Sequence, residues 1–161
     1  MTYGYSHIGV ATHDIEATIR FYEQVLGFPR VAEHRYEVAE GGVMRMAYFD
    51  LGREQFLVFM AATGIEGMSA DFDTGINTGL GVPRGVYHLA FRAESMDALR
   101  QRQESLRAQG VEVSDVVDLG HAHSIFFRDP NGLELECCWH LRPFGPADLM
   151  HAQKVNVAFS A

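Results

Sequence analysis

The chain has 161 residues, with 13 basic and 21 acidic side chains and a formal net charge of −8. Hydrophobic residues make up 47% and charged residues 21%, which is an ordinary composition for a globular domain. The acidic balance argues against binding to nucleic acid or to anionic membrane surfaces. The sequence shows no signal peptide and no apolar run long enough to span a bilayer, so we expect a cytoplasmic protein.

The first half of the chain reads as a strand, a helix and three more strands. Asp14 is a good N-cap for the helix, and Gly27 is a good stop signal. Alternating apolar residues and glycine turns then predict the strands. In chain order the expected strands are residues 5–11, 28–38, 43–51 and 55–61.

The second half repeats this order after a linker. Residues 62–85 are rich in glycine and show no periodicity, so they read as a loop or lid. Ser95 and Gly110 mark the ends of a second helix, and the turn "DPNG" at 129–132 precedes the last strand. The expected strands of this half are residues 86–93, 111–117, 122–128 and 133–140.

A duplication explains why two histidines lie in apolar segments. His7 and His88 are 81 residues apart and occupy the same place in each half. The sequence therefore predicts an α+β fold, in which two βαβββ modules (5–61 and 86–140) form one domain, residues 5–140, with a curved mixed sheet whose concave faces enclose a cleft. Residues 141–161 form a C-terminal extension that would cover the sheet or reach a partner subunit.

The candidate chemistry lies on the first strand of each half and on the last strand of the second. Glu134 and Glu136 are spaced by two, so they share one face of that strand, where burial would require a partner or a metal. Two imidazoles and one carboxylate form a facial triad for a divalent metal, typical of Fe(II) and oxygen chemistry. A histidine that is merely a satisfied core residue is the simpler alternative for either position.

The motifs "SHIGVATHDIEATIRFYEQVLGF", "YHLAFRA" and "FFRDPNGLELE" resemble the vicinal oxygen chelate superfamily of glyoxalases, bleomycin resistance proteins and extradiol dioxygenases. The resemblance covers about residues 5 to 140 and implies that the curved sheet surrounds a metal-binding cup, in which His7, His88 and Glu136 are the metal ligands. An alignment of Asp50 with Asp129 puts Leu57 opposite Glu136, which would leave three ligands. Gln55 stays open as a fourth ligand.

The three-ligand count is similar to that of extradiol dioxygenases, which implies cleavage of an aromatic diol by Fe(II) and O₂. Alternative metals are Mn(II), Zn(II) and Ni(II). Alternative functions are a glyoxalase, an epimerase or a thiol transferase on the same metal site, or a metal-free drug-binding protein of the bleomycin-resistance type. The resemblance also implies a homodimer and a small-molecule substrate.

Two further histidines are candidate catalytic groups. His121 and His123 are spaced by two on the strand before the last turn, so we expect them on one face. An imidazole titrates near neutral pH, so either could act as acid or base. A solvated or dimer-facing strand edge is the alternative. Dioxygenases of this group carry a tyrosine near the ligand glutamate, whereas the matching position here is Phe126. We expect the remaining histidines at the surface: His13, His34, His140 and His151.

Overall fold

A computed structural model describes residues 4–39 and 41–150, and the chain divides into two compact units. The first unit comprises residues 1–75 together with the turn Pro130–Gly132, and the second comprises residues 76–129 and 133–161. The turn Pro130–Gly132 belongs to the first unit because the Asn131 side chain forms hydrogen bonds with two buried threonines of that unit. Thr12 Oγ1 donates to Asn131 Oδ1 at 2.6 Å, and Asn131 Nδ2 donates to Thr18 Oγ1 at 3.1 Å.

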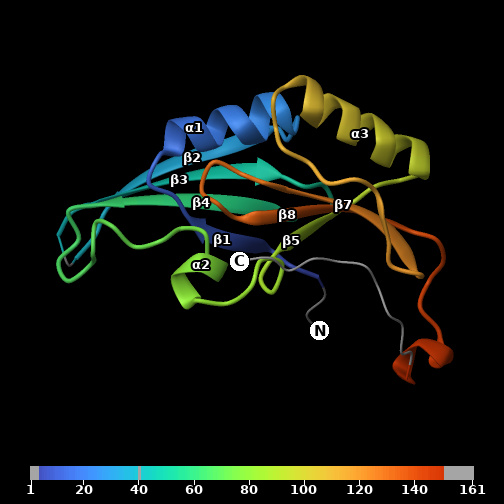
Figure 1. Cartoon of the computed structure of the whole chain (residues 1–161). Coiled ribbons are helices and arrows are strands. Elements are labelled where there is room, and N and C mark those ends of the chain that lie inside the picture. Colours follow the sequence, from blue (N-terminus) through green and yellow to red (C-terminus); the bar gives the residue numbers. More distant parts are fainter. Residues whose placement is uncertain (1–3, 40, 151–161) are drawn as a thin grey trace. The chain divides into compact units, whose positions relative to one another are not determined.

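The first unit is one βαβββ module (Figure 1). Its four-stranded sheet has the order β1-β4-β3-β2, with β1 parallel to β4 and the other pairs antiparallel. Its elements are β1 (His7–Ala11), α1 (Ile15–Arg20), η1 (Phe21–Val25), β2 (Arg30–Glu37), β3 (Val43–Asp50) and β4 (Phe56–Thr63).

The second unit repeats the same topology with the strand order β5-β8-β7-β6. The predicted α+β class and the repeated module are confirmed. The elements of the second unit are α2 (Asn77–Leu80), β5 (Leu89–Arg92), α3 (Met96–Ala108), β6 (Val117–Asp118), β7 (Ala122–Arg128), β8 (Glu134–His140) and the 3-10 turn η2 (Pro146–Met150).

The helices begin at the predicted caps. Asp14 Oδ1 accepts the Ala17 N–H at 2.9 Å, and Ser95 Oγ accepts the Ala98 N–H at 3.1 Å. Each helical segment is followed by a glycine in the left-handed region, with φ of 73° at Gly27 and 77° at Gly110. The first helix differs from the expectation in its second half, because η1 is a π-helical turn.

Two strands are shorter than the sequence predicts. In place of the strand predicted at 111–117, only Val117–Asp118 forms a strand. The reason is that the Phe126 N–H of the neighbouring strand donates to the Ser114 hydroxyl, which interrupts the regular ladder of backbone hydrogen bonds. The strand predicted at 86–93 begins at Leu89, so His88 lies immediately before it. The linker 62–85 is not entirely irregular, since it contains α2.

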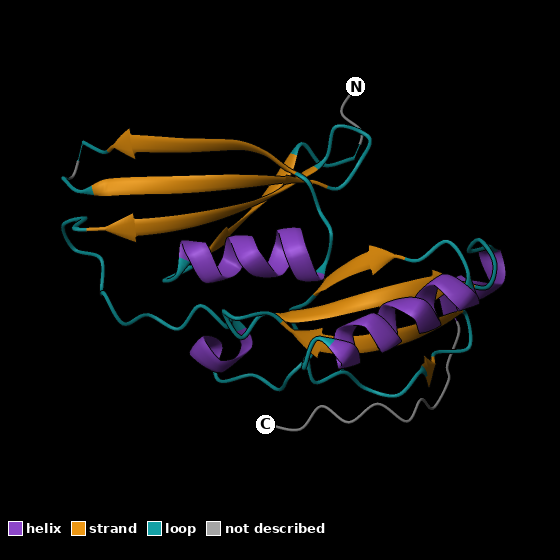
Figure 2. Cartoon of the chain, turned by 90° about the horizontal axis from the view of Figure 1, so that it is seen from above, coloured by secondary structure: helices purple, strands orange, loops and turns teal. Residues whose placement is uncertain are grey.

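Each unit buries one face of its sheet under its own helix (Figure 2). In the first unit Tyr22 packs against Phe49 and Phe59, with ring centroids 5.3 and 4.6 Å apart. In the second unit α3 contacts β7 and β8, and Leu99 and Leu106 are fully buried. The opposite face of each sheet is not covered by the helix of that unit. No helix among the described residues combines the length and the apolar character needed to cross a membrane.

Candidate metal centre and its pocket

The strand register of the second unit places Glu136 on the sheet face away from the core. Glu136 pairs with Ala90 on β5 and with Phe126 on β7, and Cys138 pairs with Arg92 one step further along. Residues directly opposite each other in adjacent strands point to the same face. The intervening strand residues point to the side on which α3 packs.

His88 and Glu136 form a direct pair. His88 Nε2 lies 3.1 Å from Glu136 Oε2, and the second carboxylate oxygen accepts a hydrogen bond from the buried Ser124 hydroxyl. Only 6% of Glu136 is exposed. His88 Nδ1 lies 2.8 Å from the Gly85 carbonyl, which can only accept, so Nδ1 carries a hydrogen. The lone pair of the neutral ring is then on Nε2, the atom that faces the carboxylate.

The segment before His88 is held by a buried asparagine. Asn77 lies in α2 and is 4% exposed. Its Nδ2 donates to the Tyr87 carbonyl at 2.7 Å, and its Oδ1 accepts the Tyr87 N–H at 2.8 Å. Because Tyr87 precedes His88, this pair of bonds fixes the backbone from which the His88 ring projects. The sequence analysis missed Asn77, which lies in the linker and carries no local signal of its partner.

Glu134 shares the face of Glu136, as predicted, but has a different role. It is 4% exposed, and its Oε1 accepts from Arg84 Nε and Arg128 Nε, each at 2.6 Å. Arg84 is adjacent to Gly85, whose carbonyl holds His88 Nδ1. The buried carboxylate therefore anchors the same segment from its other end, and the expectation that a buried glutamate here needs partners is confirmed.

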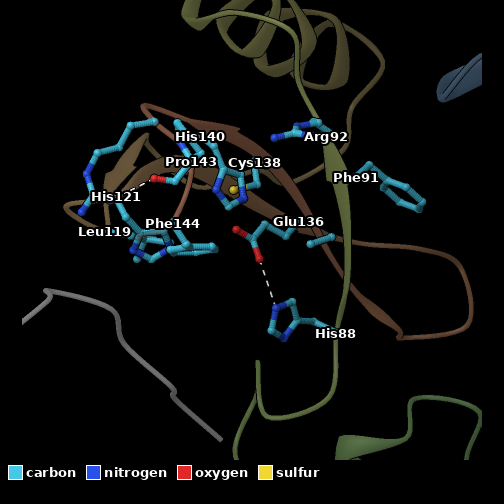
Figure 3. A pocket seen from close by; sticks show the side chains of 12 residues that line it. His88, Phe91, Arg92, Leu119, His121, Glu136, Cys138, His140, Pro143 and Phe144 are labelled. Carbon is cyan, nitrogen blue, oxygen red and sulfur yellow. Dashed lines mark hydrogen bonds and ion pairs between the residues drawn. The ribbon is translucent and has the colours of Figure 1, made fainter. Parts of the chain in front are cut away.

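A pocket of about 600 Å³ opens beside this pair. Figure 3 shows Glu136 between His88 and a group formed by His121, His140 and Phe144. The rings of His121 and His140 each pack against Phe144, with centroids 5.1 and 5.4 Å away. The pocket is lined by His88, Ala90, Phe91, Arg92, Leu119, His121, Glu136, Cys138, His140, Arg142, Pro143 and Phe144.

The structure separates the two predicted catalytic histidines. His121 lies in the turn before β7 and lines the pocket. His123 lies within β7, and its ring packs against Trp139 with its Nε2 3.6 Å from Asp118 Oδ1. The expectation that both share one face was wrong, because His121 precedes the regular strand. His140, expected at the surface, instead lines the pocket.

Two of the other histidines lie at the surface, as expected. His13 is exposed, and its Nε2 lies 2.6 Å from the Phe72 carbonyl. His34 is exposed, and its Nδ1 lies 2.9 Å from the Tyr36 hydroxyl. His151 lies outside the described residues, as does most of the C-terminal extension.

His7, the third predicted ligand, is the first residue of β1 in the first unit. It is exposed, and its Nδ1 lies 3.3 Å from Ser6 Oγ. The two parallel strand pairs correspond when His7 is matched with His88. Gly9 then matches Ala90, so Val58, the partner of Gly9, occupies the position of Glu136. The predicted register, with Leu57 there, was one residue off.

The slip has a clear cause. Asp50 is the last residue of β3 and pairs with Phe56, whereas Asp129 lies just after β7, whose last residue Arg128 pairs with Glu134. Each aspartate begins a turn and accepts a backbone N–H within it. The two positions therefore look alike although they differ in their place relative to the strand. Val58 is fully buried and has no donor atom, so it cannot be a ligand. Gln55 lies in the turn before β4.

The donor set of the second unit fits a divalent metal. Two ligands about 2.1 Å from one ion and at right angles to each other are about 3.0 Å apart, close to the 3.1 Å between His88 Nε2 and Glu136 Oε2. Each ligand also has an outer partner, the Gly85 carbonyl and the Ser124 hydroxyl, as metal ligands usually do. Within either unit, the described residues hold no group of three His, Cys, Asp or Glu side chains placed around one ion.

Two cysteines, Cys137 and Cys138, directly follow Glu136, and both are unpaired thiols. Burial raises the pKa of Cys137 from 9.0 to about 11, and burial also raises the pKa of Cys138. Neither sulfur is activated as a nucleophile, because reactivity requires the thiolate. The small, neutral side chain of Cys138 therefore forms part of the pocket wall.

Comparisons with known proteins identify the fold. No curated protein sequence matches the chain. A glyoxylase/bleomycin resistance protein/dioxygenase domain from Frankia sp. EAN1pec has a TM-score of 0.67 at 21% identity, over 87% of this chain and 99% of that one. FosX, a fosfomycin resistance protein from Listeria monocytogenes, has a TM-score of 0.59 at 19% identity, over 86% and 94%. TnmS3, an antibiotic binding protein from Streptomyces sp. CB03234, has a TM-score of 0.60 at 18% identity, over 86% and 97%.

These identities show a shared fold, within which the named functions of the compared proteins differ widely. The sequence profile of one superfamily matches residues 4–137, which is most of the chain. The repeated βαβββ topology and the predicted resemblance lead to the same assignment. The chain belongs to the Glyoxalase/Bleomycin resistance protein/Dioxygenase superfamily.

Proposed function

We propose that the chain is a metal-dependent enzyme in which His7, His88 and Glu136 hold one divalent ion. Members of this superfamily typically use divalent metal ions. The observation that carries the proposal is the 3.1 Å pair of His88 and Glu136, in which each side chain is oriented by its own outer partner. A purely structural histidine would not need both an anchored Nδ1 and a buried carboxylate facing Nε2.

The reaction we propose is ring cleavage of a small aromatic diol with O₂, using Fe(II). His7, His88 and Glu136 would hold the ion and leave coordination positions open, and the bound ion would supply Lewis-acid and redox chemistry for the diol and O₂. The pocket of about 600 Å³ is large enough for such a substrate. The rings of Phe144, His121 and His140 give it an aromatic wall, in which the two histidine rings lie at 43° and 89° to the plane of Phe144.

The residues of the chain have distinct parts in this reaction. Asn77 and the Gly85 carbonyl hold His88 with Nε2 directed at the centre. Ser124 holds the Glu136 carboxylate. His121, at the pocket wall, is the acid or base that exchanges a proton with a bound hydroxyl group. His123 lies against Trp139 and is proposed only to support this strand, not to touch substrate.

One observation favours a second candidate. Phe126 is directly opposite Glu136, where the resemblance to dioxygenases leads one to expect a tyrosine hydroxyl. Without that phenol, the same ligands serve non-oxidative chemistry, in which Mn(II), Zn(II) or Ni(II) acts as a Lewis acid in an isomerase, lyase or transferase. A metal-free protein that binds a drug, as TnmS3 binds an antibiotic, is the third alternative.

The first experiment is elemental analysis of protein purified without oxygen, for the wild type and the His88→Ala and His34→Ala variants. His34 is an exposed histidine on β2 and serves as the matched control. Near-stoichiometric iron that is lost only in His88→Ala, followed by catechol-dependent O₂ uptake, supports the dioxygenase. Zinc, nickel or manganese lost in the same way supports the Lewis-acid enzyme.

Absence of metal from all three proteins, even after reconstitution, would refute the metal proposal and support the binding protein. Sedimentation of the same samples tests the homodimer that we also propose.

A further inference from the structure

We infer that Arg92 makes the pocket of the second unit an anion site, so that the substrate is a small flat molecule carrying a carboxylate or similar anionic group. The inference names a substrate class for the proposed function and so rests on it. The sequence analysis did not single out Arg92. It lies at the end of β5, lines the pocket, and in Figure 3 projects on the same side of the strand as Glu136.

The charge of Arg92 is not used elsewhere. Throughout residues 4–39 and 41–150, no acidic side chain forms an ion pair with it, and it makes no side-chain hydrogen bond. The other arginine of the pocket is neutralised, because Arg142 donates to both oxygens of Asp148 at 2.7 and 2.6 Å. The one carboxylate that lines the pocket, Glu136, already faces His88.

The local charge therefore differs from that of the whole chain. The net charge of the protein is −8, whereas in the pocket the Arg92 guanidinium offsets the one carboxylate, Glu136. A divalent ion bound at His88 and Glu136 would make the pocket positive. Such a pocket favours an anionic ligand, because a guanidinium binds a planar carboxylate through two parallel hydrogen bonds.

The spacing of the two charged positions fits one small molecule. Ala90 pairs with Glu136, and Arg92 pairs with Cys138, so Arg92 lies two residues further along the sheet. Two residues of strand correspond to about 7 Å, which is comparable to the length of a six-membered ring with a substituent at each end. An aromatic diol with its hydroxyl groups at the metal would place an acid group on its far side near Arg92.

The test separates the anion site from the metal. In metal-stripped protein, binding of benzoate and of the neutral, similarly shaped benzamide is measured by NMR titration. We expect the wild type to bind benzoate about tenfold more tightly than benzamide, as one charge-assisted pair supports. We expect Arg92→Gln to lose this preference and Arg92→Lys to keep part of it. Arg100→Gln, which removes the same charge from the exposed side of α3, should keep all of it.

In metal-loaded protein, the same variants are compared with 3,4-dihydroxybenzoate and catechol. We expect a similar preference for the acid that depends on Arg92. An equal preference in the wild type and in Arg92→Gln would overturn the inference, as would an equal loss in Arg100→Gln. If benzoate binding depends on Arg92 but neither diol is turned over, the anion site stands and the dioxygenase proposal fails. If catechol is cleaved without any preference for the acid, the dioxygenase stands and the anion site fails.

Discussion

The two units of this protein share one topology but differ on the sheet face that their helix leaves free. In the first unit this face carries Val58 and the flanking Tyr48 and Met60, so it is apolar. In the second unit the corresponding strand carries Glu136, flanked by Glu134 and Cys138. The comparison shows that the same strand order forms with either kind of free face, while each unit packs its own helix on the other face. The free face can change from apolar to charged without altering strand order or register.

A glutamate at Val58, the position that corresponds to Glu136, is the most severe test of this comparison. We expect Val58→Glu to lower the free energy of unfolding by about 3 kcal/mol or more, because it buries a carboxylate without the partners that Glu136 has. Denaturant unfolding measures the change, and Val58→Gln, of equal size but uncharged, separates charge from volume. A variant as stable as the wild type that also bound additional metal would show that the first unit can contribute a fourth ligand.

Much of the scaffold follows from the sequence because its signals are local. The caps Asp14 and Ser95 and the glycines after each helix act on neighbouring residues, and all four were predicted. Hydrophobic alternation likewise located the strands. The one-residue slip at Val58 arose where two turns carry similar aspartates at different places, so local similarity gave the wrong register.

The site could be predicted only in part, for the same physical reason. His88 stood out because it breaks an apolar pattern at the place that His7 occupies in the first half, and Glu136 because it is a carboxylate in the last apolar strand. Asn77 did not, since its two hydrogen bonds reach a backbone ten residues away. Arg92 and His140 each read as ordinary polar residues at strand ends. Their role depends on which face the register gives them, and no short stretch of sequence determines that.

The asparagine contact offers a second test, because the structure shows it only before the second histidine. We expect Asn77→Ala to weaken metal binding by about tenfold to a hundredfold, as loss of an outer partner of a ligand does. Metal affinity is measured by competition with a chelator, and the ¹⁵N shifts of the His88 ring report its tautomer without metal. Leu80→Ala, an exposed position on the same helix, is the control.

If His88→Ala abolishes metal binding while Asn77→Ala leaves both affinity and tautomer unchanged, Asn77 has no positioning role.

A third test uses the cysteines, which only the second unit carries. The pKa of Cys137 is raised to about 11 in the folded protein by burial, whereas the unfolded thiol titrates near 9.0. The unfolded state therefore loses its proton first, and stability falls as the pH rises from 9 towards 11. We expect a loss of about 1 kcal/mol at pH 10 relative to pH 7.5. Urea unfolding of the wild type and of Cys137→Ala measures it, and a loss of the same size in the variant would assign the effect to other groups.

The smallest expected effect concerns an ion-pair cluster of the first unit that mirrors the one in the second. Arg45 donates to Glu16 at 3.0 Å and to Glu33 at 2.5 Å, whereas Glu134 lies between two arginines. Arg45 holds the pKa of Glu33 below its ordinary value of 4.5, so the stabilising contribution of Glu33 is present at neutral pH and is lost as the pH falls through that lowered pKa.

The cluster is partly exposed, and we expect Glu33→Gln to lower the free energy of unfolding by only about 0.5 kcal/mol. Denaturant unfolding at low and at high salt measures this, since salt screens exposed pairs. A salt-independent cost above 2 kcal/mol, on the order of a buried pair, would mean that the first unit also depends on its charges, and the contrast between the units would then be one of degree.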